Sequence, residues 1–148
     1  MKSIIFVMAV LLFGISAFAQ NTSELLNNYI SVKNALVNSD GRAASQAIKT
    51  FYQSLKNEEN LPIRAELLKA TEKLQKAGDN IDKERAAFND VSTIMWDLVK
   101  DSENVNELIY YQYCPMKKAY WLSMEKEIEN PYYGSAMLSC GKIVETKE

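Results

Sequence analysis

Apolar residues recur every three or four positions in four stretches of the chain, over about 23–37, 44–55, 63–74 and 81–98. This spacing is typical of amphipathic helices that bury one face. Short polar links separate the stretches and predict an antiparallel four-helix bundle in a mainly α fold. The buried face is expected to comprise Leu25, Leu26, Tyr29, Val32, Leu36, Ala44, Ala47, Ile48, Phe51, Leu55, Ile63, Leu67, Ala70, Leu74, Ile81, Arg85, Phe88, Val91, Met95 and Leu98.

Several residues predict where these helices begin and what they expose. Asp40 and the Gly-Asp-Asn run at 78–80 are suited to capping the helices that follow them. Pro62 is expected to be an early residue of the third helix, where its missing N–H costs nothing. The charged run of residues 82–85 predicts solvated surface. Met95 and Trp96 are expected to belong to the core rather than to a binding site.

The pattern changes after Asn106, where aromatic and β-branched residues dominate. Residues 108–113 predict a strand, residues 119–121 a short second strand and residues 142–144 a last strand. Residues 135–140 predict a short helix closed by Gly141. We therefore expect one domain, with a four-helix region over 20–104 and a small β-containing C-terminal cap over 105–148 that packs on the helices.

The first residues match the three parts of a secretory signal peptide. Lys2 precedes an apolar run from Ile4 to Phe18, and the run ends in an Ala-Phe-Ala sequence. The alternative is a membrane anchor, but the run is shorter than the about 20 residues that span a bilayer. We expect residues 1–19 to be removed, leaving a soluble periplasmic or otherwise exported protein with no remaining membrane segment.

Composition excludes several classes of function. The 148 residues include 17 basic and 19 acidic side chains, a formal charge of −2, which gives no electrostatic footprint for nucleic acid. The chain has no histidine. This excludes histidine-dependent triads and histidine-containing zinc or iron sites. No Cys-x-x-Cys motif is present. We therefore do not expect an enzyme.

The candidate chemistry lies in two sulfur pairs of the C-terminal cap. Cys114 and Met116 flank a proline, and Met137 and Cys140 are three positions apart. In an extended segment residues i and i+2 point to one side, and on a helical turn residues i and i+3 share a face. Two thiolates and two thioethers could thus face one centre. Such soft donors select copper(I) or silver(I) over zinc.

Aromatic residues surround these sulfurs, and Trp121, Tyr120 and Tyr133 are candidates for the shell of a bound ion. The competing interpretation is a structural disulfide between Cys114 and Cys140, which exported proteins retain. The two cysteines are 26 positions apart. By loop closure a bond between them would contribute about 3–4 kcal/mol. The two interpretations can alternate, because metal binds the thiolate and not the disulfide.

The C-terminal part of the chain carries a set of characteristic positions, which are Cys114, Pro115, Met116, Tyr120, Trp121, Asn130, Pro131, Tyr132, Gly134, Met137, Cys140 and Gly141. Together with the helical part from Tyr29 to Lys100, they resemble an uncharacterised exported bacterial domain of unknown function. That domain also occurs fused to periplasmic adaptors (membrane fusion proteins) of copper and silver efflux systems. The resemblance covers most of the chain after residue 19 and implies a periplasmic copper(I) or silver(I) binding protein whose partner is an efflux adaptor or another metal donor or acceptor protein. The alternative is a disulfide-stapled interaction module of the cell envelope.

Overall fold

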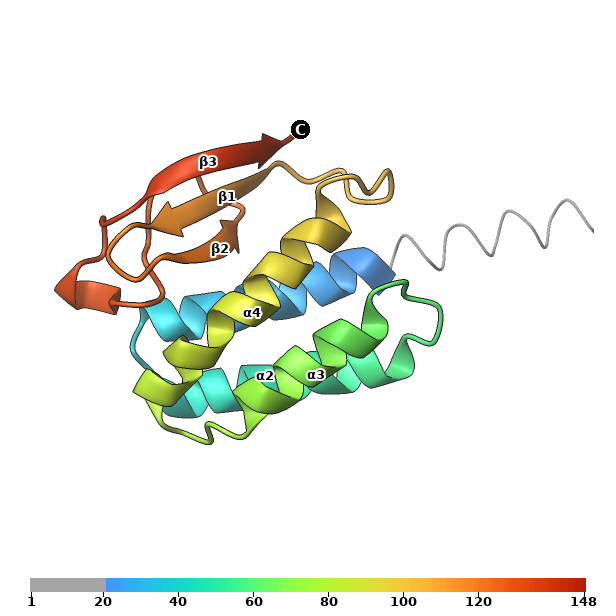
Figure 1. Ribbon diagram of the computed structural model, residues 1–148, viewed down its shortest axis with the longest axis horizontal. Coiled ribbons are helices and arrows are strands. Elements are labelled where there is room, and N and C mark those ends of the chain that lie inside the picture. The colour runs from blue at the N-terminus through green and yellow to red at the C-terminus, as the bar shows by residue number, and fades with distance from the viewer. Residues whose placement is uncertain (1–20) are drawn as a thin grey trace, which may run out of the picture.

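A computed structural model describes residues 21–148, which form a mainly helical fold with a small antiparallel sheet at the C-terminus (Figure 1). Residues 21–37 are helical, followed by α2 (Gly41–Asn57), α3 (Arg64–Gln75) and α4 (Ile81–Val99). The strands are β1 (Ile109–Cys114), β2 (Ala119–Ser123) and β3 (Lys142–Lys147), and a short 3-10 helix, η1 (Gly134–Ala136), precedes β3. The signal peptide expected over 1–19 lies outside the described residues.

The helix starts follow local capping chemistry. The side chain of Asp40 accepts a hydrogen bond from the Ala43 N–H at 2.9 Å, and Asn80 accepts one from the Lys83 N–H at 3.0 Å. Both capping predictions are confirmed. The prediction for Pro62 is wrong by two residues, because α3 begins only at Arg64.

Most of the predicted helical stripes are confirmed as the core, and Tyr29 lies at its centre. The members of the predicted face that are only partly buried are Ala47, Ile63, Ile81, Arg85 and Leu98. The Tyr29 ring stacks on Phe88 at 5.2 Å and meets Phe51 edge-on at 6.4 Å. Its hydroxyl lies 2.7 Å from the Ser92 hydroxyl and accepts a hydrogen bond from the Leu122 N–H of β2 at 3.1 Å. One fully buried tyrosine therefore connects three helices and the sheet.

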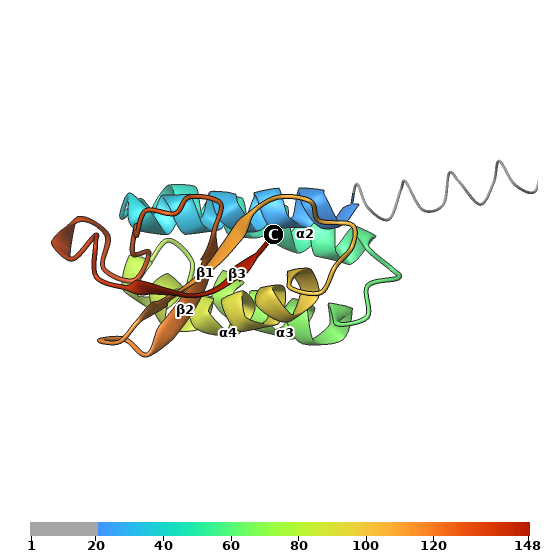
Figure 2. The ribbon, with the colours of Figure 1, turned by 90° about the horizontal axis from the view of Figure 1, so that it is seen from above.

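The three strands form an antiparallel sheet in the order β2-β1-β3. The sheet covers one side of α4 and of the helix at residues 21–37, while α2 and α3 lie on the opposite side (Figures 1 and 2). Tyr111 of β1 stacks on Trp96 of α4, with ring centres 4.7 Å apart. Helices and strands share one continuous apolar cluster, so the sheet is part of the same core.

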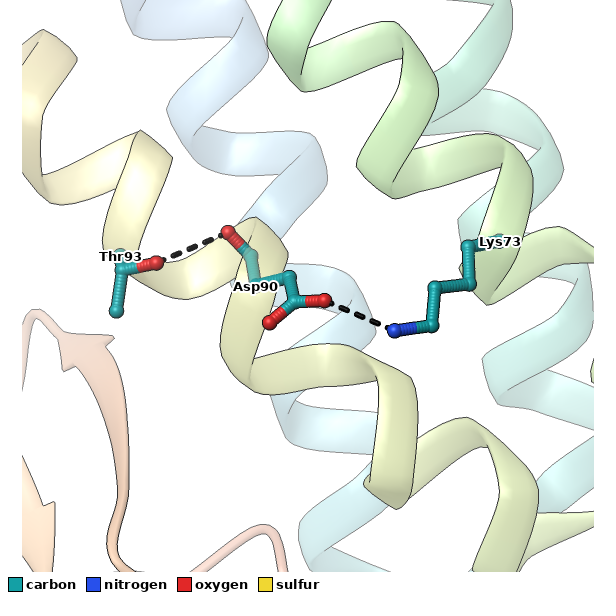
Figure 3. Close-up of polar contacts among 3 residues, drawn as sticks. All are labelled: Lys73, Asp90 and Thr93. Atoms are coloured by element: carbon teal, nitrogen blue, oxygen red, sulfur yellow. Dashed lines mark hydrogen bonds and ion pairs between the residues drawn. The ribbon is translucent and has the colours of Figure 1, made fainter.

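The contact between α3 and α4 also has a polar outer edge. Lys73 pairs with Asp90 at 3.0 Å, and the Thr93 hydroxyl donates to the Asp90 carbonyl at 3.1 Å (Figure 3). Both charged side chains are more than half exposed. A pair of this kind contributes at most about 1 kcal/mol. The packing of α3 on α4 therefore rests on apolar residues.

The prediction of solvated surface over residues 82–85 is wrong for two of its members. Glu84 is completely buried, and neither of its carboxylate oxygens has a hydrogen-bond partner within residues 21–148. The Arg85 guanidinium donates to the Pro131 carbonyl at 2.7 Å, to the Leu36 carbonyl at 2.8 Å and to the Ser39 hydroxyl at 2.9 Å. Arg85 therefore ties α4 to two loops, including one that leads to the cysteines.

Candidate functional site

The fold brings Cys114 and Cys140 together, and we call these two residues the thiol pair. Cys114 is the last residue of β1 and is fully buried, whereas Cys140 is half-buried and lies just before β3. Both cysteines carry free thiols, and the Cys140 thiol lies close enough to Cys114 for the two groups to influence each other's charge. Antiparallel pairing sets Tyr113 opposite Lys142, so the end of β1 meets the start of β3. Sheet register thus explains why residues distant in sequence meet.

Cys140 is held in place by Asn130, a fully buried residue of the preceding loop. The Asn130 amide donates to the Cys140 carbonyl at 2.7 Å, and the Asn130 backbone N–H donates to the Leu138 carbonyl at 2.8 Å. The side-chain oxygen of Asn130 accepts from the Tyr132 N–H at 2.8 Å. One asparagine therefore fixes the path of the chain on both sides of η1.

Gly141 allows the chain to leave Cys140 close to the sheet. A Cβ atom at this position would lie 2.9 Å from Cη2 of Trp121 and 3.0 Å from the Tyr113 carbonyl oxygen. Cβ atoms in proteins essentially never lie as close as 2.9 Å to another heavy atom, so a residue larger than glycine would push this segment away from Trp121. Gly141 is required for close approach, whereas the sequence suggested a role as helix C-cap.

Of the predicted aromatic shell, Trp121 lies on the same face of the sheet as Cys114. Trp121 is paired with Gln112, and residues two apart on a strand share a face. The indole is fully buried, and within residues 21–148 its N–H has no hydrogen-bond partner. By the same alternation Tyr120, which is paired with Tyr113, belongs to the opposite face.

Tyr133 lies beside the turn that carries Met116. The Lys117 ammonium lies over the Tyr133 ring, 5.0 Å from its centre. This contact joins the turn at residues 115–118 to the loop that leads to Cys140. Tyr133 therefore borders the thiol region through a cation–π contact that is worth about 0.5–1 kcal/mol at an exposed site.

The two methionines lie at the surface. Met116 is 64% exposed and Met137 is 37% exposed. The expected extended corner at residues 114–116 is wrong, because residues 115–118 form a turn. The expected helix over 135–140 is also wrong, because η1 ends at Ala136. Beyond it, the Cys140 N–H donates a hydrogen bond to the Met137 carbonyl at 3.1 Å, which closes a single turn. The structure thus buries the Cys114 thiol, half-buries the Cys140 thiol and leaves both thioethers at the surface.

The environment of the thiol pair acts on its ionisation. Burial, then the charge of Cys114 and the hydrogen bond with it, raise the pKa of Cys140 above its usual value. Two adjacent thiolates repel each other, so a cation or a covalent bond that joins the sulfurs favours loss of the Cys140 proton. Within the part of the chain that is described, no three Cys, Asp or Glu side chains form a metal-binding cluster. The donors available at this site are therefore sulfurs.

Residues that position the site were only partly visible in the sequence. Asn130 was named only among the positions that carry the family resemblance, and Gln112 only as part of the strand predicted over residues 108–113. The Gln112 amide donates to the carbonyls of Glu125, Lys126 and Glu127 at 3.1, 3.4 and 3.4 Å. A polar residue inside an otherwise apolar strand was the available signal for this role.

These features define a mainly helical domain with a thiol pair at the edge of its small sheet, in which Cys114 is buried and Cys140 is half-buried. The chain belongs to the family described as "Protein of unknown function (DUF3347)", which matches residues 25–107. The matched range covers most of the helical region and ends before Cys114. No curated protein and no solved structure matches the chain. No helix over residues 21–148 is long and apolar enough to cross a membrane.

Proposed function

We propose that the chain binds a soft monovalent metal ion, copper(I) or silver(I), through the thiolates of Cys114 and Cys140. The observation that carries this proposal is the contact between the two thiols at the junction of β1 and β3. Thiolates are soft donors that favour these ions, and the chain has no histidine to compete with them. The donor set therefore fits a sulfur-bound ion.

The residues around the pair have distinct roles in this proposal. Cys114 provides a fixed, buried donor, and Asn130 holds the backbone that presents Cys140. Met116 and Met137 are exposed thioethers on the two segments that adjoin the pair. We assign them to capture or release of the ion at the surface. Binding must displace the thiol protons, so affinity is expected to rise with pH.

The biological setting follows from the N-terminal sequence and from the resemblance. A cleaved signal peptide would deliver the protein to the periplasm, where it would act in metal efflux or homeostasis. Its partner would be an efflux adaptor or another metal donor or acceptor protein, as the resemblance implies. We also retain the antiparallel bundle as the interpretation of the helical region, which serves as a scaffold and not as an enzyme.

The same thiol contact supports a second function. Oxidation of the pair would give a disulfide that staples the C-terminal cap of an envelope interaction module, with no metal involved. Such a bond is expected to contribute about 3–4 kcal/mol by loop closure. The two functions differ in the state of the sulfurs in the exported protein.

A competition titration tests the metal proposal. The reduced protein, without residues 1–19, is titrated anaerobically with copper(I) against a chromogenic chelator. We expect about one ion per chain, because the pair provides one soft site. Cys114→Ser and Cys140→Ser should each abolish competition, and Met116→Leu and Met137→Leu should weaken it. Met124→Leu is the control for a methionine outside the two sulfur segments.

The oxidation state of the exported protein separates the two functions. Protein isolated from the periplasm under thiol trapping is weighed by mass spectrometry. A disulfide reduces the mass by two hydrogens, and this result favours the stapled module. Trapped free thiols, or copper that remains with the protein, favour the metal site.

A further inference from the structure

Lys33 is a lysine whose stem is buried and whose ammonium reaches water. Its side chain extends from the helix at residues 21–37, and the residue is only 2% exposed. The ion pairs within residues 21–148 are Lys73–Asp90 and Lys100–Asp97, and Lys33 forms no hydrogen bond in that part of the chain. Its ammonium is nevertheless not one of the buried polar atoms that lack a partner in these residues. A lysine can bury its stem and keep its ammonium in water, so the charge of Lys33 is accessible to a ligand.

Lys33 lines a pocket of about 390 Å³ between its own helix and the segment that follows β2. Glu125 and Glu129 line the opposite wall, and Asn34 and Asn38 add amide groups on the helix side. Burial lowers the pKa of the Lys33 amine, while the charges of Glu129 and Glu125 act in the other direction. The pocket thus holds one cation and two carboxylates that face each other without touching.

The pocket wall that carries the two carboxylates is anchored to the sheet. The Gln112 amide binds the backbone carbonyls of residues 125–127 from inside the fold. This leaves the Glu125 side chain free to line the pocket, because only the backbone of the segment is engaged. The opposite wall is a regular helix. The backbones that carry both sets of charges are therefore held before any ligand arrives, which reduces the ordering cost of binding.

We propose that this pocket binds a small zwitterion of the α-amino-acid class. Its carboxylate would pair with Lys33 and its ammonium with Glu125 and Glu129. An anion alone would meet two carboxylates, and a cation alone would meet the lysine, so only a ligand with both charges complements the pocket. The volume falls within the about 300–1,000 Å³ typical of small-molecule pockets.

The remaining lining residues indicate the kind of side chain that fits. Ile30, Val37 and Met124 are apolar and share the pocket with the charged groups. They provide a surface for an aliphatic side chain once the charged end is engaged. An aliphatic amino acid such as leucine is therefore a suitable probe. The pocket does not include either cysteine of the thiol pair.

Calorimetry on the reduced protein lacking residues 1–19 tests this site with L-leucine, N-acetyl-L-leucine and L-leucinamide. We expect leucine to bind and each blocked analogue to bind at least about tenfold more weakly, since each loses one charged pairing. Lys33→Met and Glu129→Gln should each weaken leucine binding by a similar factor. Lys49→Met, at an exposed position of α2, should leave it unchanged.

Other results would overturn the proposal. These are the absence of leucine binding at millimolar concentration, or equal binding of leucine and an analogue blocked at one end. If Lys33→Met does not fold, Glu129→Gln and the two analogues still decide the matter. A double Cys114→Ser, Cys140→Ser variant should retain leucine binding. Loss in that variant would contradict a site separate from the thiols.

Discussion

The contacts that stabilise the helical region differ in kind from those that stabilise the C-terminal cap. In the helical region, apolar stripes on each helix meet in a shared core, and many residues carry equivalent roles. In the cap, single polar residues such as Asn130 and Gln112 hold whole loop segments through several hydrogen bonds. The helical scaffold therefore depends on the spacing of apolar residues, whereas the position of the thiols depends on a few individual side chains.

The two regions meet at an aromatic contact. Phe88 of α4 stacks on Tyr29 at 5.2 Å and contacts Tyr132 of the cap at 6.0 Å. Tyr132 in turn meets Trp121 edge-on at 6.1 Å. The chain of rings runs from the centre of the helical core to the sheet face that carries Cys114. The scaffold is thus expected to support the site through packing.

Phe88→Ala should give the largest loss of stability, because it removes this contact from both regions. Phe88 is fully buried. Truncation of such a residue costs about 3–5 kcal/mol. Urea unfolding monitored by circular dichroism measures the change, with the exposed Lys49→Ala as control. A loss below about 1 kcal/mol would show that the core relaxes around the cavity and that the aromatic link is dispensable.

Asn130→Ala should destabilise the C-terminal cap more than the helical region. The Cys140 carbonyl and the Tyr132 N–H lose their partners, and unsatisfied buried groups cost about 1–3 kcal/mol each. We expect an overall loss of about 2–3 kcal/mol in urea unfolding. Disulfide formation between Cys114 and Cys140 under mild oxidant should also become slower.

The control for that experiment is Asn60→Ala, an exposed position before α3. It should change neither the stability nor the rate of oxidation. Unchanged oxidation in Asn130→Ala would mean that sheet register alone positions the thiols.

Arg85→Met should have a smaller effect that is concentrated in the loops. The substitution keeps much of the apolar stem but removes the donors to Leu36, Ser39 and Pro131. Because the site is partly open to water, we expect a loss of about 1–2 kcal/mol. Amide hydrogen exchange should accelerate around residues 131–134 more than in α2. Uniform acceleration would contradict a local role, and Arg42→Met is the exposed control.

Glu84 should make stability depend on pH. Burial, with a smaller contribution from the charge of Asp79, raises the pKa of Glu84 from 4.5 to about 7, while Arg85 lowers it and Asp40 raises it. The folded state therefore holds this proton more tightly than the unfolded state does. The resulting stabilisation is complete below pH 4.5 and is lost as pH rises through about 7.

Glu84→Gln removes this titration and keeps the shape of the side chain. As pH rises from about 5 to about 8, the urea midpoint of the wild type should fall below that of the variant. Glu66→Gln, at an exposed position of α3, should follow the wild type. Urea midpoints that change with pH in the same way in the wild type and in Glu84→Gln would show that the Glu84 carboxylate has a partner in solution.

Much of the helical region was predictable from the sequence because its periodicity is strong. Stripes such as Leu25 to Leu36 and Phe88 to Met95 are buried as expected, and Asp40 and Asn80 cap as predicted. The three strands also appear where aromatic and β-branched residues indicated them. These predictions depend on local spacing, which the sequence displays directly.

The arrangement of the site was less predictable, because it depends on tertiary contacts. Nothing local indicates that Glu84 is buried or that Arg85 reaches Pro131. The expected helical turn at residues 135–140 is wrong because Asn130 draws the backbone at Leu138 and Cys140 towards itself. The surface position of Met116 follows from the turn after Pro115.

The most direct test of the account is the copper(I) affinity of the reduced wild type compared with that of the double Cys114→Ser, Cys140→Ser variant. Both proteins compete with the same chelator at several pH values. The account predicts that the wild type takes up about one ion with an affinity that increases with pH, and that the double variant takes up none. Equal competition by the two proteins would contradict a metal site at the thiol pair.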